Sequence, residues 1–281
     1  MKRHLHLLII DPQNDFCDLP AAYQPAGEAP ALPVPGAHAD MQRVAALIRQ
    51  GGAGLSDISV TLDSHHRIDV AHPTFWMQAG GAAVSPFTQI TLADLEQGRY
   101  APRDPSAMPR VREYLAALEQ AGRYQLMVWP THCEMGSWGH NVHADVRAAY
   151  NVWEEQTLRT VNKVTKGTNP WTEHYSAIQA EVPDAEDDST QVNAAFIAQL
   201  LSADRVYITG EAGSHCVKAT TEHIVDHWDP AQLARLVIVT DCMSPVAGFA
   251  SQHDAFIRAM RERGLTIAQA SDVAAELVAN A

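Results

Sequence analysis

The stretch Leu5-His6-Leu7-Leu8-Ile9-Ile10-Asp11 decides the fold class of this chain. Its apolar residues do not alternate with polar ones, which is typical of a strand covered on both faces, as in a parallel sheet. Similar runs recur along the chain, and helix-like stretches separate them. The predicted strands are 5–11, 58–63, 124–129, 160–165, 205–210 and 235–241, with a weaker one at 266–270, and the predicted helices are 39–50, 109–120, 142–156, 192–202, 216–227, 252–263 and 272–279. This alternation predicts an α/β protein, a three-layer α/β/α sandwich with a doubly wound, mainly parallel six-stranded sheet.

Two stretches interrupt the alternation. Residues 17–36 are rich in Pro, Ala and Gly, and residues 73–105 contain Gly80-Gly81 and several prolines without a clear period. Loops of this length are usually functional lids or insertions. We therefore expect a single domain over residues 1–281, with long loop insertions near 17–36 and 73–105.

Composition excludes several classes of function. The chain of 281 residues has 20 Lys and Arg against 33 Asp and Glu, a net charge of −13. That charge repels polyphosphates, so we expect neither nucleic acid nor an anionic membrane as a partner. No apolar run approaches the roughly 18–20 residues that span a bilayer, and Asp11 interrupts any signal-peptide core. The four cysteines form no C-x-x-C pair, which argues against a disulfide framework or a zinc ribbon. We expect a soluble, cytoplasmic protein.

Polar side chains follow five of the predicted strands. In an open parallel sheet, ligands bind beyond the carboxyl ends of the strands. The residues at these ends include a carboxylate pair, histidines, a lysine and a thiol: Asp11, Asp63, His65, His72, His132, Lys166 and Cys216. Their convergence predicts a site at this edge of the sheet.

Cys216 is the candidate nucleophile. A cysteine that opens a helix lies at the positive end of the helix dipole, which lowers the pKa of the thiol, and Lys166 would act in the same direction. Asp11 could take the thiol proton as a general base. The alternative is that Cys216 is a small packing residue and that Asp11 caps a helix.

The pair Asp63-x-His65 is the candidate metal site. On an extended segment, residues two apart face the same way, so both side chains can reach one ion. His132 would supply a third ligand and His72 a fourth, and period two favours His65 over His66. Such a set suits a catalytic site for one divalent ion, zinc first and iron or manganese as alternatives. The alternative for each histidine is a hydrogen-bonded loop residue.

Phe16 and Trp129 are candidate substrate-binding residues. They lie close in sequence to the strand-end residues, and aromatic side chains at the rim of a pocket can hold a flat ring between them. The alternative is ordinary core packing.

Taken together, these segments resemble the nicotinamidase/pyrazinamidase branch of the isochorismatase-like cysteine hydrolases. The resemblance rests on the blocks Asp11-Pro12-Gln13-Asn14-Asp15-Phe16-Cys17, Asp63-x-His65, Trp129-Pro130-Thr131-His132-Cys133, Lys166-Gly167 and Gly210-x-Ala212-x-x-His215-Cys216-Val217, which occur in the family's order. It extends from about residue 5 to residue 245 and implies the same α/β/α fold.

The resemblance also implies roles for individual residues. The catalytic set would be Asp11, Lys166 and Cys216, and the metal ligands would be Asp63, His65 and His132, with His72 as the further histidine that some members have. The backbone amides of Ala212 and Cys216 would form the oxyanion hole, with a cis peptide bond between Glu211 and Ala212. Phe16 and Trp129 would clamp the substrate ring.

The implied activity is metal-dependent hydrolysis of nicotinamide, or of a related cyclic carboxamide, to the acid and ammonia through a thioester on Cys216. The partner would be this small-molecule amide, and relatives commonly form homo-oligomers. Alternatives within the superfamily are hydrolysis of an N-carbamoyl or ureido compound and isochorismate-type vinyl ether hydrolysis. Outside it, the alternatives are a non-catalytic binding relative and a metal or redox sensor that uses the Cys216 thiolate.

Overall fold

A six-stranded parallel sheet forms the centre of the computed structural model, which describes residues 2–281. Its order is β10-β9-β8-β1-β2-β7, and every pairing is parallel. The strands are β1 (Leu5–Ile10), β2 (Asp57–Asp63), β7 (Asn162–Lys166), β8 (Arg205–Gly210), β9 (Leu236–Val239) and β10 (Thr266–Ala268). All six residues of β1 are buried, as its uninterrupted apolar sequence predicts.

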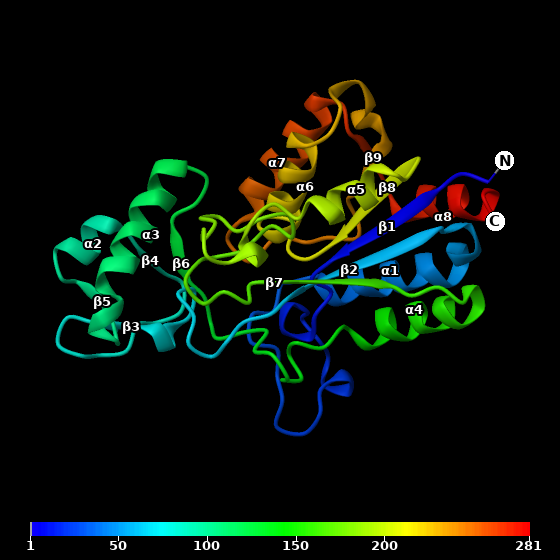
Figure 1. Cartoon of the computed structure of the whole chain (residues 1–281). Helices are drawn as coiled ribbons and strands as arrows, with labels where there is room; N and C mark the ends of the chain where they lie inside the picture. Colours follow the sequence, from blue (N-terminus) through cyan, green and yellow to red (C-terminus); the bar gives the residue numbers. More distant parts are fainter. Residues whose placement is uncertain (1) are drawn as a thin grey trace.

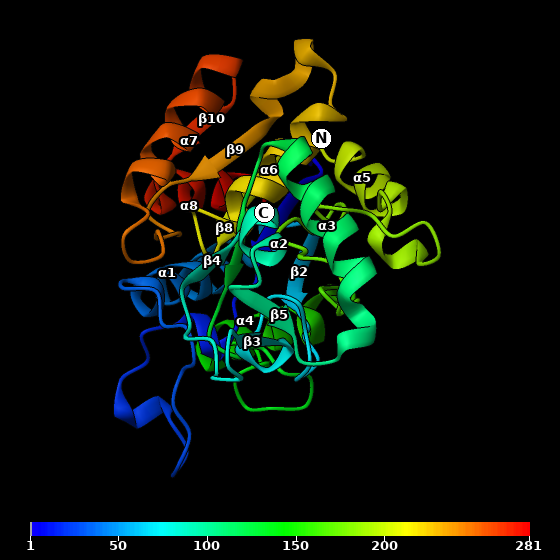
Figure 2. The same ribbon diagram turned by 90° about the vertical axis from the view of Figure 1, so that its left-hand side faces the viewer.

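Helices cover both faces of this sheet (Figures 1 and 2). One face carries α1 (Ala37–Gly51), α4 (Ala144–Thr157) and α8 (Ala270–Ala279); the other carries α5 (Ala194–Leu201), α6 (Cys216–Asp226) and α7 (Ala250–Arg263). The chain winds outward from β1 through β2 to β7, then returns to β8 on the other side of β1. The predicted doubly wound α/β/α sandwich is confirmed, and its change of direction lies at β1.

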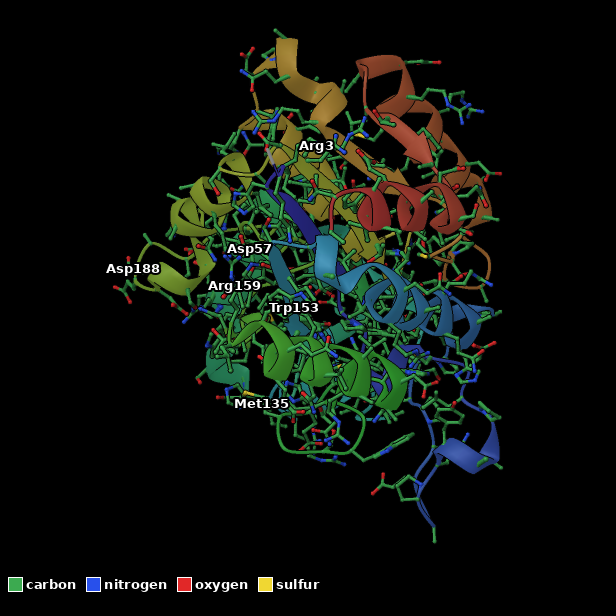
Figure 3. The ribbon with its side chains drawn as sticks, turned by 90° about the vertical axis from the view of Figure 1, so that its right-hand side faces the viewer. Arg3, Asp57, Met135, Trp153, Arg159 and Asp188 are labelled. Carbon is green, nitrogen blue, oxygen red and sulfur yellow. The ribbon has the colours of Figure 1, made fainter. Side chains whose placement is uncertain are left out.

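Long-range hydrogen bonds anchor α4 to the chain that precedes β2, and Figure 3 labels two of the residues that donate them, Trp153 and Arg159. Trp153 of α4 is buried, and its indole nitrogen donates to the carbonyl oxygen of Gly52 over 3.1 Å. Arg159, just after α4, donates to the carbonyl oxygen of Ser56. These bonds tie α4 to the chain that enters β2, so the two elements hold a fixed relative position.

Residues 73–128 form a lobe beyond the carboxyl ends of the parallel strands (Figure 1). It contains β3 (Trp76–Gln78), β4 (Thr88–Ile90), α2 (Leu92–Glu96), β5 (Tyr100–Pro102), α3 (Met108–Ala121) and β6 (Leu126–Val128). The lobe has a hydrophobic cluster of its own, in which Trp76, Ile90 and Leu115 are buried. The prediction of a long loop at 73–105 is therefore wrong, since this stretch contains regular elements. The prediction failed because strands of three residues are too short to show a hydrophobic period. The extent of the domain remains a prediction.

The predicted strand 124–129 does not belong to the main sheet. Its central part, β6, pairs antiparallel with β4 inside the lobe, and β10 takes the sixth place in the main sheet. A strand buried in a lobe core has the same continuous apolar sequence as a strand of a parallel sheet, so the pattern could not separate the two.

The remaining chain is irregular or forms short 3-10 helices of one or two turns. These short helices are Asn14–Phe16, Ala21–Tyr23, Gly52–Gly54, Pro73–Phe75, Pro105–Ala107, Asp188–Thr190 and Pro230–Arg235. Residues 17–36 contain only one of them besides short bridging contacts, as expected for a loop. Among the helices of residues 2–281, none combines the length and the apolar character that crossing a bilayer requires.

Candidate active site

Asp11, Lys166 and Cys216 lie together at the carboxyl edge of the sheet. Asp11 follows β1, Lys166 ends β7, and Cys216 opens α6 beside the end of β8. The Lys166 Nζ atom is 2.9 Å from Asp11 Oδ2 and 3.7 Å from Cys216 Sγ. Thr61 donates to Asp11 Oδ1 over 2.5 Å. The structure therefore brings together the three predicted catalytic side chains, which are 50 to 205 residues apart in sequence.

The charges in this cluster are almost completely removed from water. Burial raises the pKa of Asp11, and the Lys166 ammonium only partly offsets this. Burial alone would lower the pKa of Lys166, but the carboxylates of Asp11 and Asp63 outweigh it and hold that pKa well above its usual range. Lys166 is thus a fixed cation between two carboxylates.

The prediction of a low pKa for the Cys216 thiol is wrong. Burial raises the pKa of the thiol well above its usual value, and the nearby Asp11 and Asp63 carboxylates raise it further, against the opposing effect of Lys166. The helix terminus and the lysine do not compensate for the loss of solvent. The resting side chain is therefore a thiol, and a base must remove its proton before it can act as a nucleophile.

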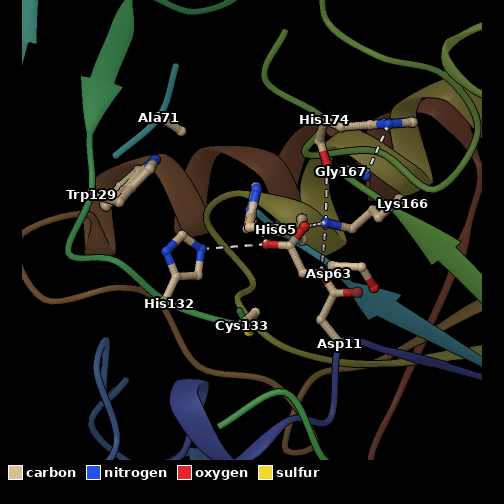
Figure 4. Close-up of polar contacts among 12 residues, drawn as sticks. Asp11, Asp63, His65, Ala71, Trp129, His132, Cys133, Lys166, Gly167 and His174 are labelled. Atoms are coloured by element: carbon tan, nitrogen blue, oxygen red, sulfur yellow. Dashed lines mark hydrogen bonds and ion pairs between the residues drawn. The ribbon is translucent and has the colours of Figure 1, made fainter. Parts of the chain in front are cut away.

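Asp63, His65, His72 and His132 form a second buried cluster beside the first. Figure 4 shows Asp63, His65 and His132 of this cluster. Each of the three histidines offers one ring nitrogen that could bind a metal, and these three nitrogens lie within 4.8 Å of one another. Asp63 Oδ2 is 3.0 Å from His65 Nε2 and 3.4 Å from His132 Nε2. Ligands bound at about 2.1 Å around one ion are roughly 3.0–3.4 Å apart, so the two distances from Asp63 match donors that share a single divalent ion. His72, the predicted fourth ligand, lies within the set, whereas His66 is exposed.

Asp63 joins the two clusters. Its Oδ1 atom accepts a hydrogen bond from Lys166 over 2.9 Å, while Oδ2 faces the histidines, and Figure 4 shows it between Lys166 and His132. Burial would raise the pKa of Asp63, but His65 and Lys166 hold it well below its usual range. The carboxylate therefore stays ionised, as a metal ligand must.

The protonation of the histidines reflects their neighbours. Burial lowers the pKa of His72 to about 2, which keeps this imidazole neutral and able to bind a metal. Burial would also lower the pKa of His65, but the carboxylates of Asp63 and Asp69 raise it well above its usual value. Asp69 Oδ2 is 3.1 Å from His65 Nδ1 and so orients the ring from behind. Sequence reasoning missed Asp69, although its spacing of four residues from His65 was visible.

Side chains of the segment from Asp11 to Cys17 hold the candidate metal ligands in place. Gln13 both donates to the Asp63 carbonyl oxygen and accepts from the Asp63 amide, each over 2.7 Å. Asp15 Oδ2 accepts from the Cys133 amide over 2.7 Å, and the Cys133 carbonyl oxygen accepts from the His65 amide over 3.0 Å. These bonds bring the segment with His132 to the end of β2, although β6 is not a strand of the main sheet.

The backbone around Cys216 provides two free amide donors. The peptide bond between Glu211 and Ala212 is cis, as the resemblance implies. Within residues 2–281, neither the Ala212 amide nor the Cys216 amide donates a hydrogen bond, whereas the His215 and Val217 amides both donate to the Ala212 carbonyl oxygen. Two free amides beside a thiol could hold a negatively charged oxygen, as an oxyanion hole does.

A pocket with a mainly apolar wall opens over both clusters. Its lining residues are Phe16, Leu32, Asp63, Trp129, His132, Glu173, Tyr175, Ala212, His215, Cys216 and Val246. Both predicted aromatic residues are among them. Trp129 Nε1 donates to the Tyr175 hydroxyl over 3.0 Å, and the Trp129 ring also meets the His215 ring edge to face at 5.1 Å. Sequence reasoning missed Glu173 and Tyr175, which follow Lys166 in a segment without a periodic pattern.

Comparisons with known proteins gave matches of structure only. Neither a known family profile nor a curated protein sequence matches the chain. The nicotinamidase/pyrazinamidase of Acinetobacter baumanii superposes with a TM-score of 0.61 at 17% identity, over 96% of this chain and 98% of its own. The chain has the nicotinamidase fold.

Two further structures with the nicotinamidase fold agree. The yeast nicotinamidase has a TM-score of 0.62 at 17% identity, over 94% of this chain and 99% of its own. A pyrazinamidase of Pyrococcus horikoshii, solved in complex with zinc, has a TM-score of 0.55 at 19% identity, over 95% and 99% of the two chains. These matches confirm at the level of fold the resemblance that the motifs indicate.

Proposed function

We propose that this chain is a metal-dependent cysteine amidohydrolase that converts nicotinamide or a related cyclic carboxamide to the acid and ammonia. The observation that carries the proposal is the buried network centred on Lys166. The Lys166 ammonium contacts Asp11, Cys216 and Asp63, and Asp63 also faces the histidine cluster. A nucleophile, its base and a metal-type ligand set thus share one pocket. The proteins with the same fold named above are nicotinamidases and pyrazinamidases, which supports this choice of substrate.

The first half of the reaction follows from the positions of these groups. Asp11 takes the proton of the Cys216 thiol, and Sγ forms a bond to the carbonyl carbon of the substrate. The amides of Ala212 and Cys216 hold the oxygen as it becomes negative, an effect typically of about 3–4 kcal/mol. Asp11 then returns the proton to the nitrogen as the C–N bond breaks, so that ammonia leaves and a thioester remains on Cys216.

The second half regenerates the enzyme. A water molecule attacks the thioester, Asp11 takes one of its protons, and the C–S bond breaks to release the acid and the Cys216 thiolate, which recovers the proton from Asp11. Lys166 keeps Asp11 close to Sγ throughout. A divalent ion held by Asp63, His65, His72 and His132 would supply Lewis acidity and an attachment point for a ring nitrogen. Phe16 and Trp129 would orient the ring.

Ammonia release from nicotinamide and pyrazinamide tests this proposal. We expect the purified protein to release ammonia from at least one of them. This release should stop after chelation and resume when zinc, iron(II) or manganese is added. Release from neither amide, by folded protein that holds about one metal ion per chain, would contradict the assigned substrate class. An N-carbamoyl or ureido compound would then be the next substrate to measure.

Replacing His132 by alanine tests the ligand set. We expect the metal affinity, measured by titration after chelation, to fall by at least roughly 10–100-fold. Loss of a side chain that only supports a ligand already has an effect of that size. His66→Ala is the matched control, because His66 is a neighbouring but exposed histidine outside the cluster. Equal affinities of the two variants would show that His132 is not a ligand.

A further inference from the structure

Glu173 is a buried carboxyl group that lines the active-site pocket without a role in the reaction described above. Its side chain belongs to the segment after β7, and only 4% of the residue is exposed. Oε1 accepts a hydrogen bond from the amide of His174 over 2.9 Å. Oε2 has no hydrogen-bond partner anywhere in residues 2–281. A buried polar atom without a partner costs about 1–3 kcal/mol, so it needs an explanation.

The backbone of Glu173 is held in place on both sides. Its amide donates to the Tyr114 hydroxyl of α3 over 3.2 Å, and its carbonyl oxygen accepts from the Glu181 amide over 2.9 Å. Glu173 forms no salt bridge with any cation of the described chain, and burial raises the pKa of its carboxyl to about 7. Glu173 is therefore held at the pocket lining with one carboxyl oxygen unpaired.

We propose that Glu173 is a substrate-binding residue that accepts a hydrogen bond from the amide N–H of the carboxamide and disfavours the carboxylate product. The inference rests on the proposed function. As a carboxylate, Glu173 has only acceptor lone pairs, so it can accept from an N–H and cannot donate to the product. The product acid has lost that N–H and carries a negative charge, which faces a carboxyl group in a poorly solvated pocket. Glu173 thus favours binding of the amide and release of the acid.

Binding of nicotinamide and nicotinate to metal-loaded protein tests this assignment. Calorimetry in a Cys216→Ala background avoids turnover, and the readout is the ratio of the two affinities. We expect Glu173→Gln to reduce the preference for the amide by about 10-fold, because the glutamine NH2 can donate to the product carboxylate. With Cys216 restored, the same change should raise KM and strengthen inhibition by nicotinate.

Glu181→Gln is the matched control. Glu181 is also buried in the same segment, and burial raises the pKa of its carboxyl to about 7, but it faces Arg123 at 3.6 Å and does not line the pocket. A merely structural effect of removing a buried carboxyl group would appear in both variants. Should Glu173→Gln fail to fold, Glu173→Asp retains the charge and withdraws the oxygen from the pocket, and it should weaken nicotinamide binding.

The outcomes separate this inference from the proposed function. If the unsubstituted protein releases ammonia from nicotinamide but Glu173→Gln changes the affinity ratio no more than Glu181→Gln does, the role of Glu173 is refuted and the amidase remains. If the unsubstituted protein neither binds nor hydrolyses nicotinamide or pyrazinamide, the proposed function itself fails, and the inference fails with it.

Discussion

Replacing Cys216 by alanine is expected to abolish amide hydrolysis, with a fall in kcat of at least about 1000-fold. In the proposed reaction this thiol, 3.7 Å from Lys166 Nζ, is the nucleophile, and no other cysteine lines that pocket among the described residues. Alanine leaves the oxyanion amides and the metal ligands in place. Substrate binding should therefore survive. The measurement is the rate of ammonia release at a saturating concentration of nicotinamide.

The control for Cys216→Ala is Cys242→Ala. Cys242 is fully buried but lies outside the pocket, so this variant loses a thiol and some packing without losing the nucleophile. We expect it to lose stability, by about 1 kcal/mol, and to keep its kcat. Residual activity of Cys216→Ala close to that of Cys242→Ala would rule out thioester chemistry and favour a metal-activated water instead.

Replacing Asp11 by asparagine is expected to lower kcat by roughly 100- to 10,000-fold, the range that a general base contributes. Asparagine has nearly the same shape, but it cannot take a proton from a thiol whose pKa is raised by burial. Lys166 keeps Asp63 as its counter-ion, 2.9 Å away, so the cation is not left unpaired. The loss should therefore appear in kcat rather than in folding, which thermal unfolding checks.

A second measurement distinguishes a base from a merely structural carboxylate. The thiol of Cys216 should react with iodoacetamide faster in Asp11→Asn than in the unsubstituted protein, because the Asp11 carboxylate is one of the charges that raise the pKa of the thiol. A lower kcat together with faster alkylation would show that the variant has lost proton transfer and not thiol reactivity. Asp94→Asn is the control, since Asp94 caps α2 in the lobe, away from the pocket. Unchanged kcat and alkylation rate in Asp11→Asn would show that another group deprotonates Cys216.

Much of the site could be predicted because each motif lies at the end of a strand. Apolar runs such as Leu5–Ile10 mark buried parallel strands, and the residues that follow them must meet at one edge of the sheet. Asp11, Asp63 and Lys166 were therefore predictable as neighbours. Period two selected His65 over the exposed His66 for the same local reason.

Other features depend on contacts that no local pattern encodes. His132 reaches the site through hydrogen bonds of its segment with Asp15 and His65, not through a strand of the main sheet. Glu173 faces the pocket because Tyr114 in the lobe and Glu181 hold its backbone. Both positions arise from residues far apart in sequence, and sequence analysis of one chain does not reveal such pairings.

Local patterns were enough to predict the layer architecture, the edge of the sheet at which the site lies and the chemical types gathered there, because hydrophobic periodicity recurs in each strand and helix along the chain. The folded structure was needed to show that 73–128 is a lobe with its own core and that β10, not β6, completes the sheet, because these pairings join distant parts of the chain. The folded structure also sets the pKa of the Cys216 thiol. The pKa of that thiol depends on how completely the folded chain excludes water from it, and that exclusion outweighs the helix terminus and the lysine that the sequence displays.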